Sequence, residues 1–154
     1  MLLNLYTTKV KTPLFPKSFF EDFNRYEFSK ILIVKYHDEV IGGTVLVIWK
    51  DVVYEWFVCG EDRIFKNAFP STLATYSGII YAAENGFLRF DMMGAGAPGD
   101  GGYGVRDFKA KFGGKLVEHG RFVHINNPIL FALGKTAVKI IKKIKLKVLI
   151  RMPL

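Results

Sequence analysis

The sequence predicts one domain of mixed α+β architecture, and three observations lead to this prediction. The chain has 154 residues, half of them apolar and 15% aromatic, so it can bury a core and is too apolar to be disordered. Runs rich in β-branched and aromatic residues alternate with segments of helical apolar spacing. The expected order is helix, antiparallel meander, helix, strand, helix, strand and helix. That order describes a central, mixed and mostly antiparallel sheet flanked by helices.

The first half of the chain is expected to form one helix and three strands. Residues 15–27 predict a short amphipathic helix, because phenylalanines recur there at helical spacing. Residues 30–59 predict three strands joined by polar turns. Gly42 and Gly43 interrupt the second strand, which indicates a bulge or a close approach of another backbone segment.

A strand–helix–strand step is expected to follow. Ser71 is placed as the N-cap of a helix that ends at Asn85 and Gly86. The strand at residues 87–93 then follows the strand at residues 53–58 through this helix. Such a step implies a right-handed crossover, so the two strands should be parallel.

Three further elements are predicted toward the C-terminus. Residues 104–112 should form a short helix, and residues 115–125 a strand or hairpin. Residues 127–150 should form a terminal helix, with Gly134 as the place for a bend.

Composition excludes several classes of protein. Cys59 is the single cysteine, so neither an internal disulfide nor a cysteine-rich metal site is expected, and the histidines show no metal-ligand spacing. No apolar run reaches the roughly 18 residues of a membrane-spanning helix. Residues 1–11 are too polar for a signal peptide, so a cytoplasmic location is expected.

The positive charge is concentrated in one segment. The net charge is +8, and eight basic residues but no acidic residue follow Glu118. The preceding part has equal numbers of basic and acidic residues. A basic tail favours an anionic partner such as RNA, a phospholipid surface or a phosphorylated substrate, and the plain alternative is a solvated helix face.

A glycine-rich loop lies between an acidic strand end and a basic segment. Asp91 ends the strand at residues 87–93, which is expected to be central, and it either caps the loop amides or belongs to a site. If residues 104–112 are helical, Arg106 and Lys109 share one face. The residues that anchor the helix on a neighbouring face are Val105, Phe108 and Phe112. Two cations there suit a phosphate or a developing oxyanion, and the alternative is an exposed basic helix.

The runs "FLRFDMMGAG" and "YGVRDFKAKFGGKLVEHG" closely resemble the hallmark of the Fem-type (FemAB-like) peptidoglycan aminoacyltransferases. That family belongs to the GCN5-related N-acetyltransferase (GNAT) superfamily. The resemblance covers about residues 5–135, and its "G-V-R-x-F-K-x-x-F-G-G" run is the most specific part.

The resemblance implies a GNAT-like acyltransferase fold and an amide-forming reaction. An aminoacyl group from aminoacyl-tRNA, or an acyl group from acyl-CoA, would pass to an amine on a peptidoglycan precursor or on a small molecule. No cofactor would be bound permanently. The transferase domain is expected at residues 1–134. Residues 135–154 would form a basic amphipathic helix or tail, packed on that domain or extending from it.

The resemblance also suggests site residues. Lys109 matches the family lysine and would be the catalytic cation, with Phe108 beside it and Arg106 or Tyr103 holding donor or acceptor. Asp91 is the second catalytic candidate. From the strand pattern alone, two aromatic residues that share a strand face could line a substrate groove. They are Tyr54 and Trp56.

Two alternatives to tRNA-dependent transfer are open. One is a coenzyme A-dependent N-acyltransferase, although residues 61–71 lack the glycine pair with which GNAT acetyltransferases cradle the pyrophosphate. The other is a catalytically inert module that binds RNA or membrane. In the tail, lysines alternate with apolar residues at helical spacing. This pattern suits peripheral contact with the inner membrane surface and equally suits the tRNA backbone.

Overall fold

The computed structural model describes residues 1–10, 12–96, 104–120 and 122–150, the last nine by their backbone alone. The chain divides into two units, Met1–Leu116 and Val117–Leu154. The elements of the first unit are α1 (Leu2–Leu5), a π-helical turn (Tyr6–Val10), α2 (Lys17–Phe23), β1 (Ser29–Tyr36), β2 (Glu39–Trp49), β3 (Val52–Gly60), α3 (Pro70–Glu84), β4 (Arg89–Asp91) and α4 (Gly104–Ala110). The second unit contains α5 (Pro128–Ile150).

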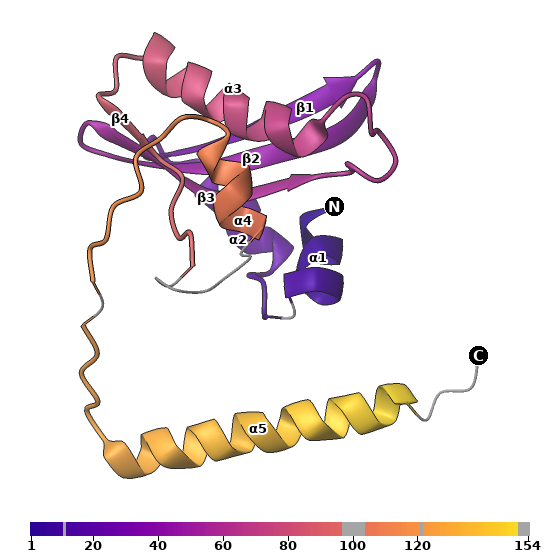
Figure 1. Ribbon diagram of the computed structural model, residues 1–154, viewed down its shortest axis with the longest axis vertical. Helices are drawn as coiled ribbons and strands as arrows, with labels where there is room; N and C mark the ends of the chain where they lie inside the picture. The colour runs from indigo at the N-terminus through magenta and orange to yellow at the C-terminus, as the bar shows by residue number, and fades with distance from the viewer. Residues whose placement is uncertain (11, 97–103, 121, 151–154) are drawn as a thin grey trace. The chain divides into compact units, whose positions relative to one another are not determined.

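The sheet has the order β1-β2-β3-β4, as Figure 1 shows. The first three strands form the predicted antiparallel meander, and β4 pairs with β3 in parallel after the crossover through α3. The mixed, mostly antiparallel sheet is therefore confirmed. The strand that ends at Asp91 was expected to be central, but within the described residues it lies at the sheet edge. Among the described residues no strand pairs with its outer side, and β4 itself pairs with β3 only from Arg89 to Asp91.

The two hairpin turns of the meander fall where they were predicted. His37 follows β1 with φ of 51°, and Lys50 follows β2 with φ of 55°. Left-handed backbone at a two-residue connection matches the twist of the strands on either side. The polar turn residues therefore fix the register of the strands.

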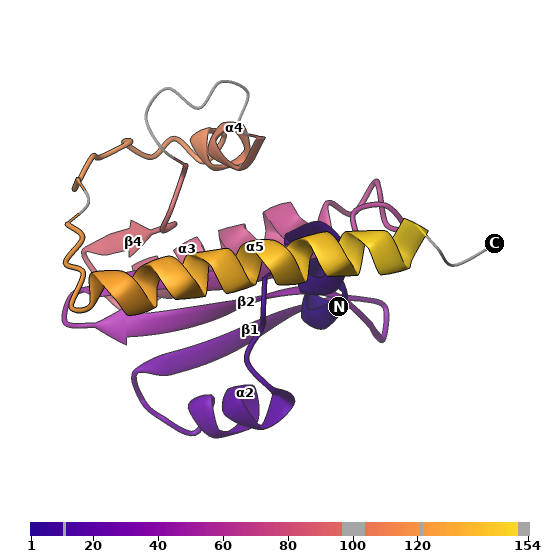
Figure 2. The same cartoon turned by 90° about the horizontal axis from the view of Figure 1, so that it is seen from below.

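Helices cover the two faces of the sheet. Figures 1 and 2 show α3 across one face, with α1 and α2 on the other. On the α2 side, Phe23 packs with Val45 and Phe57, and the predicted phenylalanine stripe joins this cluster. On the α3 side, the second core cluster is built from Leu46, Val53 and Ala82.

A bulge in β3 changes which of these two faces the following side chains occupy. Val45 lies opposite Phe57 and Leu46 lies opposite Glu55, so Trp56 is an extra residue in β3. Phe57 packs in the α2 cluster. Leu46, the partner of Glu55, packs on the α3 side. The bulge thus allows Glu55 to face α3 while Phe57 faces α2.

The start of α3 differs from the prediction. Ser71 is not the N-cap, because the helix begins at Pro70 after Phe69, which has φ of 48°. The carboxylate of Asp62 accepts hydrogen bonds from the Ser71 backbone N–H at 3.1 Å and from the Ser71 hydroxyl. An acid from the preceding loop thus satisfies a free amide of the first turn. The predicted end at Asn85 and Gly86 is confirmed, with φ of 74° at Gly86.

One C-terminal prediction is wrong. The described residues between 115 and 125 form no strand or hairpin, and Gly120 there has φ of 71°, which is incompatible with an extended strand. The predicted terminal helix is confirmed as α5, which runs through Gly134, and a bend at that glycine stays a prediction. The division predicted after residue 134 falls inside this helix, and the extent of a transferase domain stays a prediction.

Glycines let the start of α3 lie directly against the sheet. Gly42 pairs with Gly60, and a Cβ at Gly60 would lie only 2.4 Å from the backbone nitrogen of Ser71. A Cβ at Gly43 would lie 2.8 Å from the carbonyl oxygen of Leu32. The predicted bulge and close approach at Gly42 and Gly43 are both confirmed, since the β1–β2 register also shifts beside Gly42.

We expect Gly60→Ala to destabilise the first unit by about 1–3 kcal/mol, because backbone atoms cannot move aside as a flexible side chain can. Urea unfolding followed by circular dichroism measures this change. Gly104→Ala is the matched control, since a Cβ there meets no atom within 4 Å. Equal midpoints for the two variants would contradict the packing described.

Candidate functional site

Asp91 shapes the chain as it leaves β4. One carboxylate oxygen, Oδ1, accepts a hydrogen bond from the backbone N–H of Met93 at 2.6 Å. Met93 itself has φ of 59°, a left-handed conformation that this contact helps to hold. The loop-capping interpretation of Asp91 is therefore confirmed, and its catalytic role stays a prediction.

Two cations of α4 bind the same segment from the other side. The Lys109 ammonium donates hydrogen bonds to the carbonyl oxygens of Met92 and Gly94, the latter at 2.8 Å. The Nε of Arg106 donates to the carbonyl oxygen of Ala95 at 3.0 Å. Both side chains are half-buried. The alternative of an exposed basic helix is thus wrong for these two residues, which hold the segment that leaves β4.

The sequence analysis missed a buried acid beside this cluster. Glu55 is only 3% exposed, and neither of its carboxylate oxygens makes a hydrogen bond within the described part of the chain. The hydroxyl of Thr75 on α3 also lacks a hydrogen bond there. Burying a carboxylate without a hydrogen bond is costly, which makes Glu55 a candidate functional residue. The sequence does contain an indication of this buried acid, because Glu55 is the single charged residue in the apolar run Val52–Cys59.

The strand register brings Glu55 close to the end of β4. Tyr54 and Asp91 form the last parallel pair, so Glu55 is the first residue of β3 beyond it. The Lys109 ammonium is near enough to interact electrostatically with both Glu55 and Asp91. Two strand ends and one helix therefore place two carboxylates around one ammonium group.

Burial dominates the protonation equilibria of this cluster. It raises the pKa of Glu55, and the nearby Thr75 hydroxyl and Lys109 ammonium offset part of that rise. Burial also lowers the pKa of Lys109, against the attraction of Glu55 and Asp91. Each shift favours the neutral form of its group, a condition suited to proton transfer. Among the residues described, no three His, Cys, Asp or Glu side chains are grouped to hold a metal ion.

The other predicted site residues lie around or apart from this cluster. Phe108 packs edge-to-face on Phe112 at 5.3 Å between ring centroids. Val105 was expected to anchor α4 as well, but it is 44% exposed and does not. Tyr103 lies outside the described residues, so its role stays a prediction.

The two predicted groove aromatics have different surroundings. Tyr54 is half-buried and pairs with Asp91 at the last step of the parallel ladder. Trp56 packs against Phe19 and Phe23 of α2, with centroid separations of 5.9 and 5.3 Å. Tyr54 therefore adjoins the charged cluster, whereas Trp56 has a structural role in the aromatic core.

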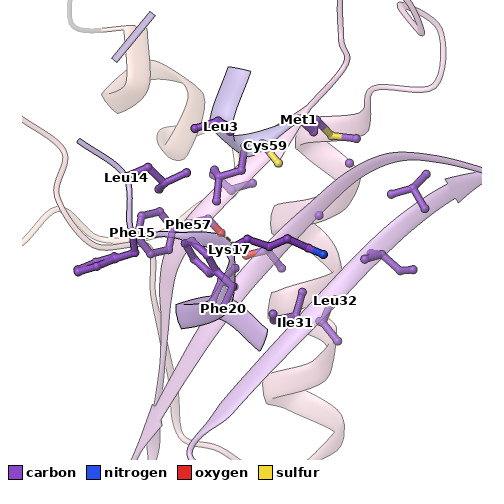
Figure 3. A pocket seen from close by; sticks show the side chains of 18 of the residues that line it. Met1, Leu3, Leu14, Phe15, Lys17, Phe20, Ile31, Leu32, Phe57 and Cys59 are labelled. Carbon is purple, nitrogen blue, oxygen red and sulfur yellow. Dashed lines mark hydrogen bonds between the residues drawn. The ribbon is translucent and has the colours of Figure 1, made fainter. Parts of the chain in front are cut away.

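A separate apolar cavity of about 450 Å³ lies on the other face of the sheet, between the N-terminal helices and β1–β3. Figure 3 shows its lining, which includes Phe20, Phe57 and Cys59. Burial raises the pKa of the Cys59 thiol, which disfavours a nucleophilic thiolate. The cavity contains none of Glu55, Asp91 and Lys109, so it is distinct from the charged cluster.

Solved structures identify the class of fold. An aminoglycoside acetyltransferase from an uncultured soil metagenomic sample, in complex with trehalose, matches 80% of this chain and 86% of its own, with a TM-score of 0.56 and 9% identity. A candidate acetyltransferase from Agrobacterium tumefaciens matches 80% and 90%, with a TM-score of 0.59 and 12% identity. One from Pyrococcus furiosus matches 81% and 87%, with a TM-score of 0.52 and 13% identity. The predicted GNAT-like fold is confirmed.

Within this class, the sequence itself defines the family. The model of the FemAB family matches residues 8–139, which is most of the chain. The chain therefore belongs to the FemAB family, as its resemblance predicted. No curated protein matches the sequence. Family and fold together support an acyl- or aminoacyltransferase.

We expect Glu55→Gln to raise the melting temperature at neutral pH. The pKa of Glu55 in the folded chain lies above its ordinary value of 4.5. The contribution of Glu55 to the stability of the native state is therefore most favourable below pH 4.5, and it is lost as pH rises through the raised pKa. The difference in melting temperature between Glu55→Gln and the wild type should disappear as pH falls toward 4.5.

Melting curves across this pH range, recorded for both proteins, measure the difference. Glu84→Gln on α3 is the control, since Glu84 is exposed and its replacement should leave the pH dependence unchanged. Parallel curves for wild type and Glu55→Gln would contradict a buried carboxylate that titrates with a raised pKa.

Proposed function

We propose that this protein transfers an aminoacyl group from aminoacyl-tRNA to an amine of a peptidoglycan or other cell-wall precursor. Membership of the FemAB family supports the class of reaction. The observation that carries the proposal is the placement of Lys109. An ammonium has three N–H donors, and two of them bind the carbonyl oxygens of Met92 and Gly94. The third N–H can donate to a substrate oxygen. The two hydrogen bonds already fix the position of its nitrogen.

The reaction needs such a donor at one step. The acceptor amine attacks the ester carbonyl carbon of the aminoacyl-tRNA, forming the C–N bond and placing negative charge on the carbonyl oxygen. The third N–H of Lys109 stabilises that oxygen. Collapse of the intermediate breaks the ester C–O bond, and the proton lost by the amine passes to the ribose oxygen of the tRNA. Glu55 and Asp91 favour the charged form of Lys109 against the effect of burial on its pKa, and Asp91 also holds the backbone at Met93.

The start of α3 supports tRNA over coenzyme A as the donor. A helix N-terminus can bind the pyrophosphate of coenzyme A through free amides. Here the Asp62 carboxylate already accepts the hydrogen bonds of Ser71 at that end. A pyrophosphate would meet this fixed negative charge, and the loop at residues 61–69 contains no glycine to bring other amides near. The residues present therefore do not fit coenzyme A at this helix.

A coenzyme A-dependent N-acyltransferase is the second candidate, because the solved structures of similar fold include an aminoglycoside acetyltransferase. It would act on a small amine and would need Asp62 to leave the α3 N-terminus. An inert module that binds RNA or membrane is the third. In an inert module, the two hydrogen bonds of Lys109 would serve only to hold the segment that follows β4, and its remaining N–H would be spare.

We expect Lys109→Met to reduce amide formation by about 10²–10³-fold, since the oxyanion loses a fixed donor. Transfer of a labelled amino acid from charged tRNA to a lipid-linked or soluble muropeptide acceptor measures this rate. Lys111→Met is the matched control, because Lys111 is exposed two positions further on. Circular dichroism should show that both variants are folded, and an unaltered rate in Lys109→Met would overturn the assignment.

A further inference from the structure

The α5 helix is well defined at its start and long. The side chain of Asn127 accepts hydrogen bonds from the backbone N–H groups of Ile129 at 3.1 Å and Leu130 at 3.0 Å. Pro128 follows in the first helical turn, where its missing N–H costs nothing. The helix then runs for 23 residues without interruption, a length of roughly 34 Å at 1.5 Å per residue.

One face of α5 is apolar. Its residues recur at spacings of three and four, and this apolar stripe consists of Leu130, Leu133, Ala137, Ile140, Ile141, Ile144 and Val148. The exposed fractions are 64% at Leu130, 61% at Leu133, 52% at Ile140 and 53% at Ile141. So much aliphatic surface along one stripe marks an interaction site.

The opposite face is basic. Lys135, Lys139, Lys142 and Lys143 follow one another at helical spacing, and no acidic residue occurs after Glu118. The helix carries six lysines in all. None of the helices in the described ranges is long and apolar enough to cross a membrane. A face rich in lysine, opposite an aliphatic stripe, is the pattern of a helix that lies in the plane of an anionic bilayer surface.

Other occupants explain only part of this pattern. RNA would neutralise the lysines but leave the apolar stripe in water. A second copy of α5 would cover the stripe but bring two rows of lysines together. An anionic lipid surface satisfies both faces, because acyl chains take up the stripe while headgroups attract the flanking ammonium groups.

We propose that α5 docks this protein on anionic phospholipid bilayers, with the apolar stripe inserted between the headgroups. The proposal is independent of the transfer reaction, since it concerns only the second unit. Its physical requirement is that both the aliphatic side chains and the lysines contribute to binding.

Vesicle co-sedimentation of the full chain tests this proposal. The protein should pellet with vesicles containing phosphatidylglycerol, much less with phosphatidylcholine alone, and less as salt rises. Ile140→Gln combined with Ile141→Gln should weaken binding about tenfold or more, because two inserted aliphatic side chains are lost. Phe131→Gln combined with Val138→Gln is the matched control, since both residues are about half exposed but lie off the stripe, and it should bind like wild type.

Three results would overturn the proposal. One is failure of the wild type to pellet with phosphatidylglycerol vesicles. Another is wild-type binding by the Ile140/Ile141 variant, which would mean that the lysines act alone, as they would on tRNA. The third is concentration-dependent dimerisation that the Ile140/Ile141 variant abolishes without any vesicle binding. Circular dichroism of the full chain reports whether each variant keeps its helix content.

Discussion

One extra residue in β3 lets neighbouring parts of the same strand serve the aromatic core and the candidate site. Without the bulge at Trp56, strand alternation would continue unchanged from Val53 to Phe57. With it, Phe57 joins the aromatic core on α2, and Glu55 remains on the side of α3 without a hydrogen-bonding partner in the described structure. The insertion thus completes the aromatic core, while Glu55 is buried at the border of the other core. The candidate site lies beside this acid.

The remaining parts of the site depend on where β3 and β4 separate. The parallel ladder ends at Tyr54 and Asp91, and beyond this pair β3 and β4 no longer form backbone hydrogen bonds with each other. Lys109 of α4 donates hydrogen bonds to two of the backbone carbonyl oxygens that follow β4. Its charge is in turn favoured by Glu55 and Asp91 and disfavoured by burial. Glu55 and Lys109 each oppose the effect of burial on the other's pKa, so the two groups depend on each other.

Local signals explain what the sequence could predict. The meander, its turns at His37 and Lys50, and the end of α3 at Gly86 depend on residues close together in the chain. The family lysine was recognisable for the same reason, since its motif is contiguous. Long-range contacts explain what was missed. The cap from Asp62 and the burial of Glu55 depend on segments that are distant in the sequence. Residues 115–125 have the local pattern of a strand, but a strand also needs a partner strand, which a local pattern does not reveal.

The measurement that tests the central claim most directly is thermal melting of the full chain with three ligands, namely charged tRNA, the same tRNA uncharged, and acetyl-coenzyme A. A ligand that binds only the native state raises the melting temperature by mass action. The account predicts a larger rise with charged than with uncharged tRNA, since only charged tRNA carries the aminoacyl ester that the site would bind, and no rise with acetyl-coenzyme A. A rise with acetyl-coenzyme A, with charged and uncharged tRNA indistinguishable, would contradict it.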